Sequence, residues 1–275
     1  MLFPACRTGQ LDELYVMLRR MSATTRREPA PQLKPDRPLY EEIRASLTEG
    51  IAAGRWAAGG AIPSESELAR HFGVAIGTIR KAVDSLVAQG ALVRRQGKGT
   101  FVTSHDSRRL LFHFFHIVGE DGSRAYPEVR TVSFSRARAD AVEAAALAIA
   151  PDERVIRVRN VLALGGRPVV VDDITIAAAL FPGLTERIFV SRDNTIYHLY
   201  QSRYGINVLR TDERLRAALA GAAVAGLLGV PSGAPLLEVR RIALTFRDRP
   251  VELRVSRVNT AAHAYHNTFG KGEAL

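Results

Sequence analysis

Five basic side chains lie in one short part of the chain, and their types and spacing make them the first candidates for chemistry. Residues 73–90 carry apolar residues at helical spacing, and Arg80 and Lys81 fall outside the apolar stripe. Residues 92–102, LVRRQGKGTFV, form a short basic hairpin that contributes Arg94, Arg95 and Lys98. A helix with one buried and one basic face, followed by a basic hairpin, predicts a winged helix-turn-helix module that binds DNA.

The preceding residues predict the elements that position this basic surface. Pro38 and the apolar series after it predict an amphipathic helix from about Leu39 to Ala53. Ser64 and Glu67 form a capping box that opens a second helix, which ends at Gly73. The third helix begins about three residues later. Two short helices joined so tightly must cross at a large angle, so the third helix projects from the module.

Length and composition limit the remaining possibilities. A chain of 275 residues favours two domains, and a hydrophobic fraction of 47% with a charged fraction of 24% is typical of a soluble globular protein. The net charge of +10 favours an anionic partner, although the basic excess is spread along the whole chain. No apolar run reaches the roughly 18 residues of a membrane span, and the N-terminus lacks a secretory signal. The single Cys6 fits a reducing cytoplasm.

The first 37 residues have a different character from the module that follows. A few apolar residues at helical spacing precede a polar, basic and proline-rich segment from Ser22 to Pro38, which has the composition of a linker. Residues 1–37 are interpreted as a flexible leader, or as an extension upstream of a chain that starts at Met21. A packed or dimer-bridging helix is the alternative interpretation.

The winged module is assigned to residues 38–103, and residues 104–109, SHDSRR, have the composition of a short linker after it. From residue 110 the chain alternates strand patterns, beginning with LLFHFFHIV, with helical patterns. Two pairs of β-branched runs predict hairpins, one joined at Gly165-Gly166 and one around residues 247–249.

Helical patterns lie between these predicted strands. RADAVEAAALAIA, residues 138–150, is rich in alanine and is followed by Pro151, which ends a helix. FPGLTERIF predicts a turn and a short helix, and NTIYHLYQSRYG predicts a helix that ends at Gly205. Strand pairs that alternate with helices and hairpins predict an α+β domain with an antiparallel sheet.

Four blocks of the N-terminal module occur in a familiar order and spacing: PLYEEI, GGAIPSESELARHFGV, GTIRKAV and VRRQGKGTFV. Together they cover about Pro38 to Val102, and this segment resembles the N-terminal domain of the GntR family of bacterial transcription regulators. The resemblance implies a cytoplasmic, nucleoid-associated regulator that reads a short palindromic operator as a homodimer and responds to a small metabolite. We expect a repressor rather than an activator.

The C-terminal blocks resemble the UTRA domain, which defines the HutC subgroup of GntR regulators and shares its fold with chorismate lyase. They are VIRVRNVLALGGRPVVVDD, NTIYHLYQSRYGINV, TDERLRA and LLGVPSGAPLLEVRRIALTFRDRPVEL. The resemblance covers about Leu110 to Phe269 and implies an effector-binding cleft beside the sheet. The expected fold class is therefore α+β, with a winged helix-turn-helix domain followed by an antiparallel-sheet, UTRA-like domain at 110–270.

The chain departs from the family pattern at the head of the third helix, where Ala75-Ile76 replaces the usual Ser-Arg. Ala75 cannot cap the helix, which costs about 1 kcal/mol, and Ile76 cannot form a bidentate pair with guanine. Ile76 either packs at the helix start or contacts a thymine methyl group, which would shift the operator toward A·T pairs. The residues expected to contact DNA are Tyr40, Ser64, Glu65, Ser66, Thr78, Arg80, Lys81, Arg94, Arg95, Gln96, Gly97, Lys98, Gly99 and Thr100.

Seven residues correspond by position to ligand-holding residues of UTRA domains: Arg157, Arg159, Asp173, Thr195, Tyr197, Glu213 and Glu252. Arg157 and Arg159 are two apart, so they share one strand face, where two guanidiniums can clamp a phosphate or carboxylate. Thr195 at a helix N-terminus adds donors to the same anion. Alternatively, the arginines pair with neighbouring acids on a solvated sheet face. A sugar phosphate, an amino-sugar phosphate or a small carboxylate fits this set.

The sequence lacks the motifs of the common enzyme and metal sites. It has no nucleophile elbow, no H-E-x-x-H, no Walker loop and no G-x-G-x-x-G after a strand. The pairs HFFH and HAYH would place their rings on opposite faces of a strand, which disfavours a metal site. We therefore expect no enzyme activity, metal or cofactor. The alternatives are a DNA-binding protein without a ligand, and a helix-turn-helix protein with an enzymatic C-terminal domain.

Overall fold

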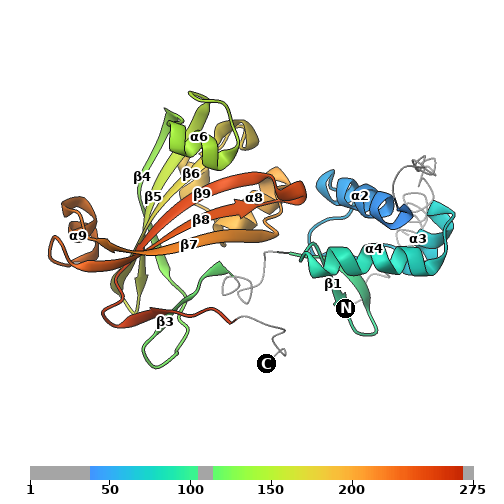
Figure 1. The fold of residues 1–275 in the computed structure, drawn as a ribbon, viewed down its shortest axis with the longest axis horizontal. Coiled ribbons are helices and arrows are strands. Elements are labelled where there is room, and N and C mark those ends of the chain that lie inside the picture. The colour runs from blue at the N-terminus through green and yellow to red at the C-terminus, as the bar shows by residue number, and fades with distance from the viewer. Residues whose placement is uncertain (1–37, 105–113, 269–275) are drawn as a thin grey trace, which may run out of the picture.

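The computed structural model describes residues 38–104 and 114–268, and in this range the chain forms two arrays of secondary structure (Figure 1). The leader predicted at 1–37 lies outside the described residues, and so does nearly all of the linker predicted at 104–109. No helix in the described ranges is long and apolar enough to cross a membrane.

The first array is a three-helix unit followed by a two-stranded hairpin. Its elements are α2 (Leu39–Ala52), α3 (Glu65–Phe72), α4 (Ile76–Ala88), β1 (Leu92–Arg95) and β2 (Gly99–Val102). Strands β1 and β2 pair antiparallel, with Leu92 opposite Val102 and Arg95 opposite Gly99. The predicted helix-turn-helix and wing are confirmed.

Local sequence signals set the ends of these helices. Ser64 accepts a hydrogen bond from the backbone N–H of Glu67, and the Glu67 side chain accepts from the backbone N–H of Ser64, which completes the predicted capping box. Gly73 ends α3 with φ of 67°, a left-handed conformation that favours glycine. Ala75 precedes α4 without any side-chain cap, as its sequence predicts.

One apolar core holds the three helices and the wing together. The fully buried side chains include Ile43 and Leu47 of α2, Ile79 and Leu86 of α4, and Leu92 at the start of the wing. Burial of side chains of this size is worth about 1.5 to 3 kcal/mol each. Because α4 is anchored by its apolar stripe, its polar face is held outward.

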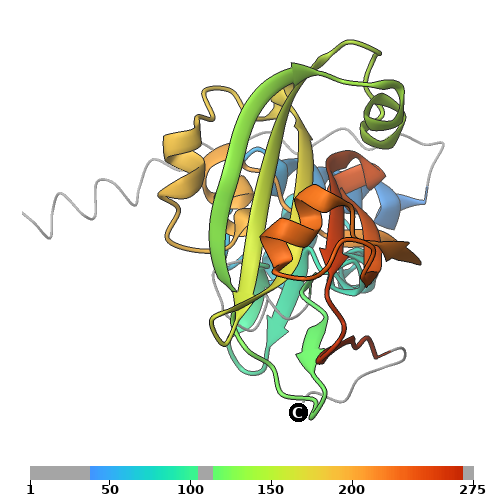
Figure 2. The same ribbon diagram turned by 90° about the vertical axis from the view of Figure 1, so that its left-hand side faces the viewer.

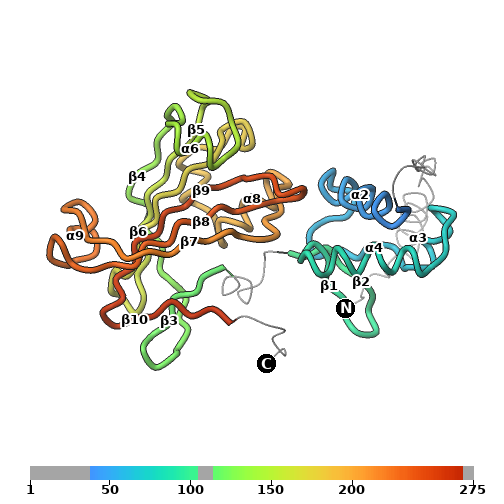
Figure 3. Tube along the Cα trace, in the orientation of Figure 1, coloured from blue at the N-terminus to red at the C-terminus, as the bar shows by residue number. Residues whose placement is uncertain are grey.

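The second array is built on one six-stranded antiparallel sheet with the order β4-β5-β6-β9-β8-β7 (Figures 1 and 3). Its strands are β4 (Glu128–Arg138), β5 (Arg154–Leu164), β6 (Arg167–Ala177), β7 (Arg210–Leu219), β8 (Pro235–Leu244) and β9 (Pro250–Val258). Both predicted hairpins are present: β5 pairs with β6 across Gly165-Gly166, and β8 pairs with β9. The α+β fold class is confirmed.

Helices cover both faces of this sheet. Helices α6 (Ala141–Leu147) and α9 (Ala222–Leu228) pack on one face, and α7 (Glu186–Val190) and α8 (Ile196–Tyr204) pack on the other (Figure 2). Strands β3 (Ile117–Gly119) and β10 (His263–Tyr265) pair antiparallel and pack on the same face of the sheet as α7 and α8. We call this face of the sheet the α8 face and the opposite one the α6 face.

Two predicted elements differ from the structure in extent. Only Ile117 and Val118 of the predicted strand LLFHFFHIV lie in β3, and its first residues fall outside the described range. Helix α6 ends at Leu147, before Pro151, because Ala148 adopts a left-handed conformation with φ of 51°. The proline therefore follows the helix without ending it.

Glu143 of α6 ties the helix to the sheet and makes acid stability testable. Its carboxylate accepts two hydrogen bonds from Arg157 at 2.7 Å, and these hold the pKa of Glu143 below its usual value of 4.5. The stabilisation is therefore fully present above about pH 4.5 and is lost as the pH falls through the lower folded-state pKa. We expect Glu143→Gln to be less stable than the wild type at neutral pH and to lose less stability on acidification. Urea unfolding at several pH values measures this, with the exposed Glu186→Gln as a control that should follow the wild type.

The two arrays touch through a small set of contacts. Arg247 donates to Glu49 at 2.6 Å, and the Gln201 side chain donates to the backbone carbonyl of Thr103 at 2.8 Å. Leu209 and Phe246 of the second array pack against the core of the first. Helix α8, which carries Gln201, thus reaches the DNA-binding module from its own position against the sheet.

Candidate functional site

A single carboxylate joins one basic residue of α4 to one basic residue of the wing. Glu65, the first residue of α3, accepts one hydrogen bond from Arg80 and one from Arg94, each at 2.9 Å. Arg94 also pairs with Asp84 at 2.6 Å. The Arg80 side chain remains 61% exposed, so its guanidinium is held in place yet open to a ligand. The sequence analysis predicts that Glu65 contacts DNA. In the structure Glu65 positions two other residues that are predicted to contact DNA, Arg80 and Arg94.

The other predicted DNA-contacting residues are spread over the same unit. The Lys81 ammonium lies 4.0 Å from the centre of the Tyr40 ring, and the Arg95 guanidinium lies 4.5 Å from that of Phe101. At the wing tip, Gly97 and Gly99 have positive φ values, which permits the tight turn that presents Lys98. Residues Gln96 to Gly99 are exposed, as the predicted role requires.

Ile76 lies in an unusual position for an apolar residue. It is the first residue of α4, and 44% of it is exposed to solvent. Its exposed side chain is open to contact with a thymine methyl group, which stays a prediction beside the alternative that Ile76 contacts no base.

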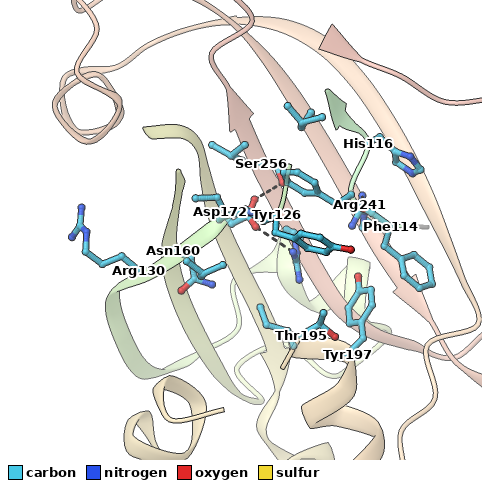
Figure 4. A pocket seen from close by; sticks show the side chains of 18 of the residues that line it. Phe114, His116, Tyr126, Arg130, Asn160, Asp172, Thr195, Tyr197, Arg241 and Ser256 are labelled. Carbon is cyan, nitrogen blue, oxygen red and sulfur yellow. Dashed lines mark hydrogen bonds and ion pairs between the residues drawn. The ribbon is translucent and has the colours of Figure 1, made fainter. Parts of the chain in front are cut away.

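The second array contains a cavity of about 660 Å³ on the α8 face of the sheet (Figure 4). Its wall is formed by the pocket-side residues of β4, β5, β6, β8 and β9, by the N-terminal end of α8, and by β3 and β10. Most of the lining is apolar or aromatic, including Phe114, Tyr126 and Tyr265. A volume of this size suits a small organic molecule.

A buried ionic network forms the floor of the cavity. Arg254 donates to Asp172 at 3.2 Å and to both carboxylate oxygens of Glu252, at 2.9 and 3.1 Å. Asp172 also accepts from Ser256 at 2.5 Å, and Glu252 accepts from the hydroxyls of Tyr197 and Tyr200, at 3.2 and 2.7 Å. Burial, reinforced by the charge of Glu252, raises the pKa of Tyr197 to about 12, so its hydroxyl remains a donor at neutral pH.

Two cations of the cavity wall, Arg130 and Arg192, have no acidic partner among the described residues, and of these Arg192 is the partly buried one. Arg192 stacks on Phe189, with 4.5 Å from the guanidinium to the ring centre, and donates to the backbone carbonyl of Phe189. Burial, together with the charge of Arg254, lowers its pKa. Three residues further on, Thr195 caps α8 by accepting from the backbone N–H of His198, and it also lines the cavity. A partly buried, unpaired guanidinium beside a helix N-terminus can bind an anion.

The structure separates the seven predicted effector residues into three groups. Thr195 and Tyr197 line the cavity. Glu252 lies in its floor network, and Glu213 lies behind the wall, where it accepts from Arg241 at 2.5 Å and from the Tyr265 hydroxyl. The remaining three lie on the α6 face of the sheet, away from the cavity: Arg157, Arg159 and Asp173.

The side-chain alternation of β5 explains why the two arginines are not at the cavity. Arg157 and Arg159 do share one strand face, as predicted, but the residue that faces the cavity is Asn160. On the α6 face Arg157 pairs with Glu143, and Arg159 donates to Asp173 at 2.6 Å. Pairing with neighbouring acids was the alternative interpretation from the sequence, and it is the arrangement observed.

Sequence reasoning missed seven of the polar residues that line the cavity: Arg130, Asn160, Asp172, Arg192, Arg241, Arg254 and Ser256. A signal was available in the alternation of β5 and β6, because the positions beside Arg159 and Asp173 are the polar residues Asn160 and Asp172 within otherwise apolar runs. A polar residue in a buried strand position is an informative exception. Among the described residues, no group of three His, Cys, Asp or Glu side chains is arranged to hold a metal ion.

Comparison with known proteins agrees with both parts of this geometry. Residues 39–102 match the model of the bacterial regulatory proteins of the gntR family, and residues 123–264 match the UTRA domain. The chain is 33% identical over 217 residues to the probable fructoselysine utilization operon transcriptional repressor of Escherichia coli K12, covering 78% of this chain and 88% of that protein. It is 31% identical over 206 residues to the histidine utilization repressor of Klebsiella aerogenes, covering 74% and 83%.

A solved structure is similar to the second array. It is the ligand-binding domain of a GntR-family transcriptional regulator from Bordetella bronchiseptica, with 34% sequence identity and a TM-score of 0.56, covering 57% of this chain and 98% of that one. The winged helix-turn-helix, the sheet with its cavity and these relatives all point to one family. The chain belongs to the gntR family of bacterial regulatory proteins and, like its HutC-type relatives, joins a helix-turn-helix domain to a UTRA domain.

Proposed function

We propose that this protein is a transcriptional repressor that binds a palindromic operator as a homodimer and is controlled by a small anionic metabolite. The observation that carries the effector part is Arg192, a partly buried guanidinium in the cavity wall without an acidic partner in the described chain. An anion bound there would also meet the N-terminus of α8 at Thr195. The named relatives that repress operons support the repressor assignment.

The effector class that fits this site is a sugar phosphate, an amino-sugar phosphate or a small carboxylate. Each carries one anionic group for Arg192 and a body small enough for about 660 Å³. The proposed site includes Thr195 and Tyr197 and replaces the pair Arg157 and Arg159 with Arg192. Glu213 and Glu252 are proposed to act indirectly, by fixing the orientation of Arg241 and Arg254.

Helix α8 supplies a physical link between the effector cavity and DNA binding. Its N-terminal residues Thr195 and Tyr197 line the cavity, and Gln201 near its C-terminal end donates to Thr103 of the winged unit. A ligand that shifts α8 would therefore change the contact with the DNA-binding module. Such a shift would change the population of the DNA-competent arrangement, and hence the operator affinity.

Fluorescence anisotropy with DNA from upstream of the gene tests the DNA-binding proposal. The affinity should fall steeply as salt rises, because phosphate contacts release counterions. It should also exceed the affinity for a random duplex of the same length. A salt-independent Kd, or equal binding to both duplexes, would refute operator recognition.

Arg80→Ala is expected to weaken operator binding by roughly 5- to 150-fold, the equivalent of about 1 to 3 kcal/mol for a base contact. The loss on random duplex should be smaller, since a base contact contributes only where the base is present. Arg167→Ala is the matched control, because Arg167 is an exposed arginine on the β5–β6 hairpin. Equal losses on both duplexes would show that Arg80 contacts only phosphate.

A further inference from the structure

One buried amide in the effector cavity lacks a hydrogen-bond partner. Asn160 lies in the middle of β5, is 0% exposed, and lines the cavity on the α8 face (Figure 4). Its Oδ1 accepts from the Thr131 hydroxyl at 2.9 Å, which fixes the side chain, whereas its Nδ2 has no partner among the described residues. Buried polar groups are almost always satisfied, so an acceptor for this N–H is expected from outside the chain.

The neighbouring carboxylate does not supply that acceptor. Asp172 lies directly opposite Asn160 in the β5–β6 register, but its two oxygens accept from Arg254 and Ser256 and not from the Asn160 amide. Asn160 is therefore the one polar side chain of this strand that is oriented by the protein and not yet satisfied by it. It has the properties of a preorganised recognition group.

The charges around Asn160 determine what kind of acceptor it can bind. The floor network contains two carboxylates, Asp172 and Glu252, which share the single guanidinium of Arg254. Asp172 lies directly opposite Asn160, so an anionic group at the Asn160 amide would stand beside a carboxylate and is less favourable there than an uncharged oxygen. Arg192, a partly buried cation without an acidic partner among the described residues, also lines the cavity. A ligand with an uncharged oxygen at Asn160 and an anionic group at Arg192 would satisfy both side chains.

We propose that Asn160 is a specificity-determining residue of the effector cavity. Its amide N–H donates to a hydroxyl or carbonyl oxygen of an effector whose anionic group binds near Arg192 and Thr195. This inference rests on the proposed function and narrows it: the effector class is hydroxylated or keto anions, such as sugar phosphates and hydroxy acids, rather than simple anions. The aromatic side chains of Phe114, Tyr126 and Tyr265 leave an apolar wall for the body of such a molecule.

Matched pairs of probes test the inference with the full-length chain. Isothermal titration calorimetry compares glucose 6-phosphate with inorganic phosphate, and gluconate with acetate, so that each pair differs by its hydroxyl-bearing body. For the wild type, at least one hydroxylated probe should bind more tightly than its simple counterpart. Asn160→Leu, which has a similar size and no donor, should reduce that preference by roughly tenfold or more and leave the affinity for the simple anion unchanged. Asn160→Ala serves as a second variant, and circular dichroism verifies that each variant is folded.

Asn207 provides the matched control variant. It is a buried asparagine, 3% exposed, and its Nδ2 likewise has no partner, but it does not line the cavity. Asn207→Leu should therefore leave the probe preference at the wild-type value. If both Asn160 variants keep the full preference, or if the wild type binds each pair equally, the role of Asn160 is refuted while the anionic effector stands. If the wild type binds none of the four anions, the anionic effector fails, and the role of Asn160 fails with it.

Discussion

Glu252→Ala is expected to lower the free energy of unfolding of the UTRA domain by about 3 to 5 kcal/mol, the usual cost of removing one member of a buried ion pair. Glu252 is 0% exposed and accepts hydrogen bonds from Tyr197, Tyr200 and Arg254. Its removal leaves Asp172 as the acidic partner of Arg254 and takes away the carboxylate to which both tyrosine hydroxyls donate. Because these tyrosines belong to α8, the loss also loosens the helix from the sheet.

Urea unfolding followed by two signals locates this effect in the chain. The only tryptophan, Trp56, packs against the core of the winged unit and reports on that unit, whereas far-UV circular dichroism also follows the sheet. The dichroism transition should shift more than the Trp56 fluorescence transition. Glu252→Gln, which keeps an acceptor for the tyrosines, should cost less, and the exposed Glu186→Ala should cost little. A loss below about 1 kcal/mol for Glu252→Ala would be typical of a surface pair and would contradict the structural role.

Arg192→Leu is expected to have opposite effects on stability and on ligand response. In the free protein the guanidinium is partly buried without a counter-charge, which is unfavourable, so its replacement should raise or preserve the melting temperature. The same change removes the charge that we propose holds the effector anion. Loss of a charged partner in a binding site typically costs 2 to 5 kcal/mol, so anion affinity should fall by roughly 30-fold or more.

A thermal-shift assay and an operator-binding assay measure these two consequences. With glucose 6-phosphate as the probe, the wild type should gain melting temperature because the ligand binds only the folded state, and Arg192→Leu should not. Operator affinity without the probe should be unchanged. Arg187→Leu is the matched control, because Arg187 is an exposed arginine in the same part of the chain and does not line the cavity. A full probe response in Arg192→Leu would refute the anion site.

The winged unit was predictable from the sequence because its signals are local. The capping box at Ser64 and Glu67, the left-handed Gly73 and the apolar stripe of α4 each depend on residues a few positions apart. The absence of a side-chain N-cap at Ala75 was also predictable from the sequence. Only the structure showed that Glu65 joins Arg80 to Arg94, since these residues are brought together by the crossing of α3 and α4 and by the wing.

The effector cavity was harder to predict because strand register and sheet order decide its lining. The hairpins at Gly165-Gly166 and around Arg247 followed from local alternation. Local alternation did not predict which face of β5 packs against α8. A shift of one residue along the strand moves the predicted cavity residue from Arg159 to Asn160. Arg254 and Asp172 are 82 positions apart in sequence and meet only because β9 pairs with β6.

The sequence by itself determined the family, the helices of the winged unit and the two hairpins of the sheet, because helix ends, turns and hairpins depend on neighbouring residues. The tertiary structure alone decided which polar residues share a cavity. Side chains on a strand alternate between two environments, and the packing of α8, β3 and β10 on one face forms the cavity there. The arginines at 157 and 159 consequently stabilise α6 and the opposite face, while Asn160 and Arg192 line the cavity.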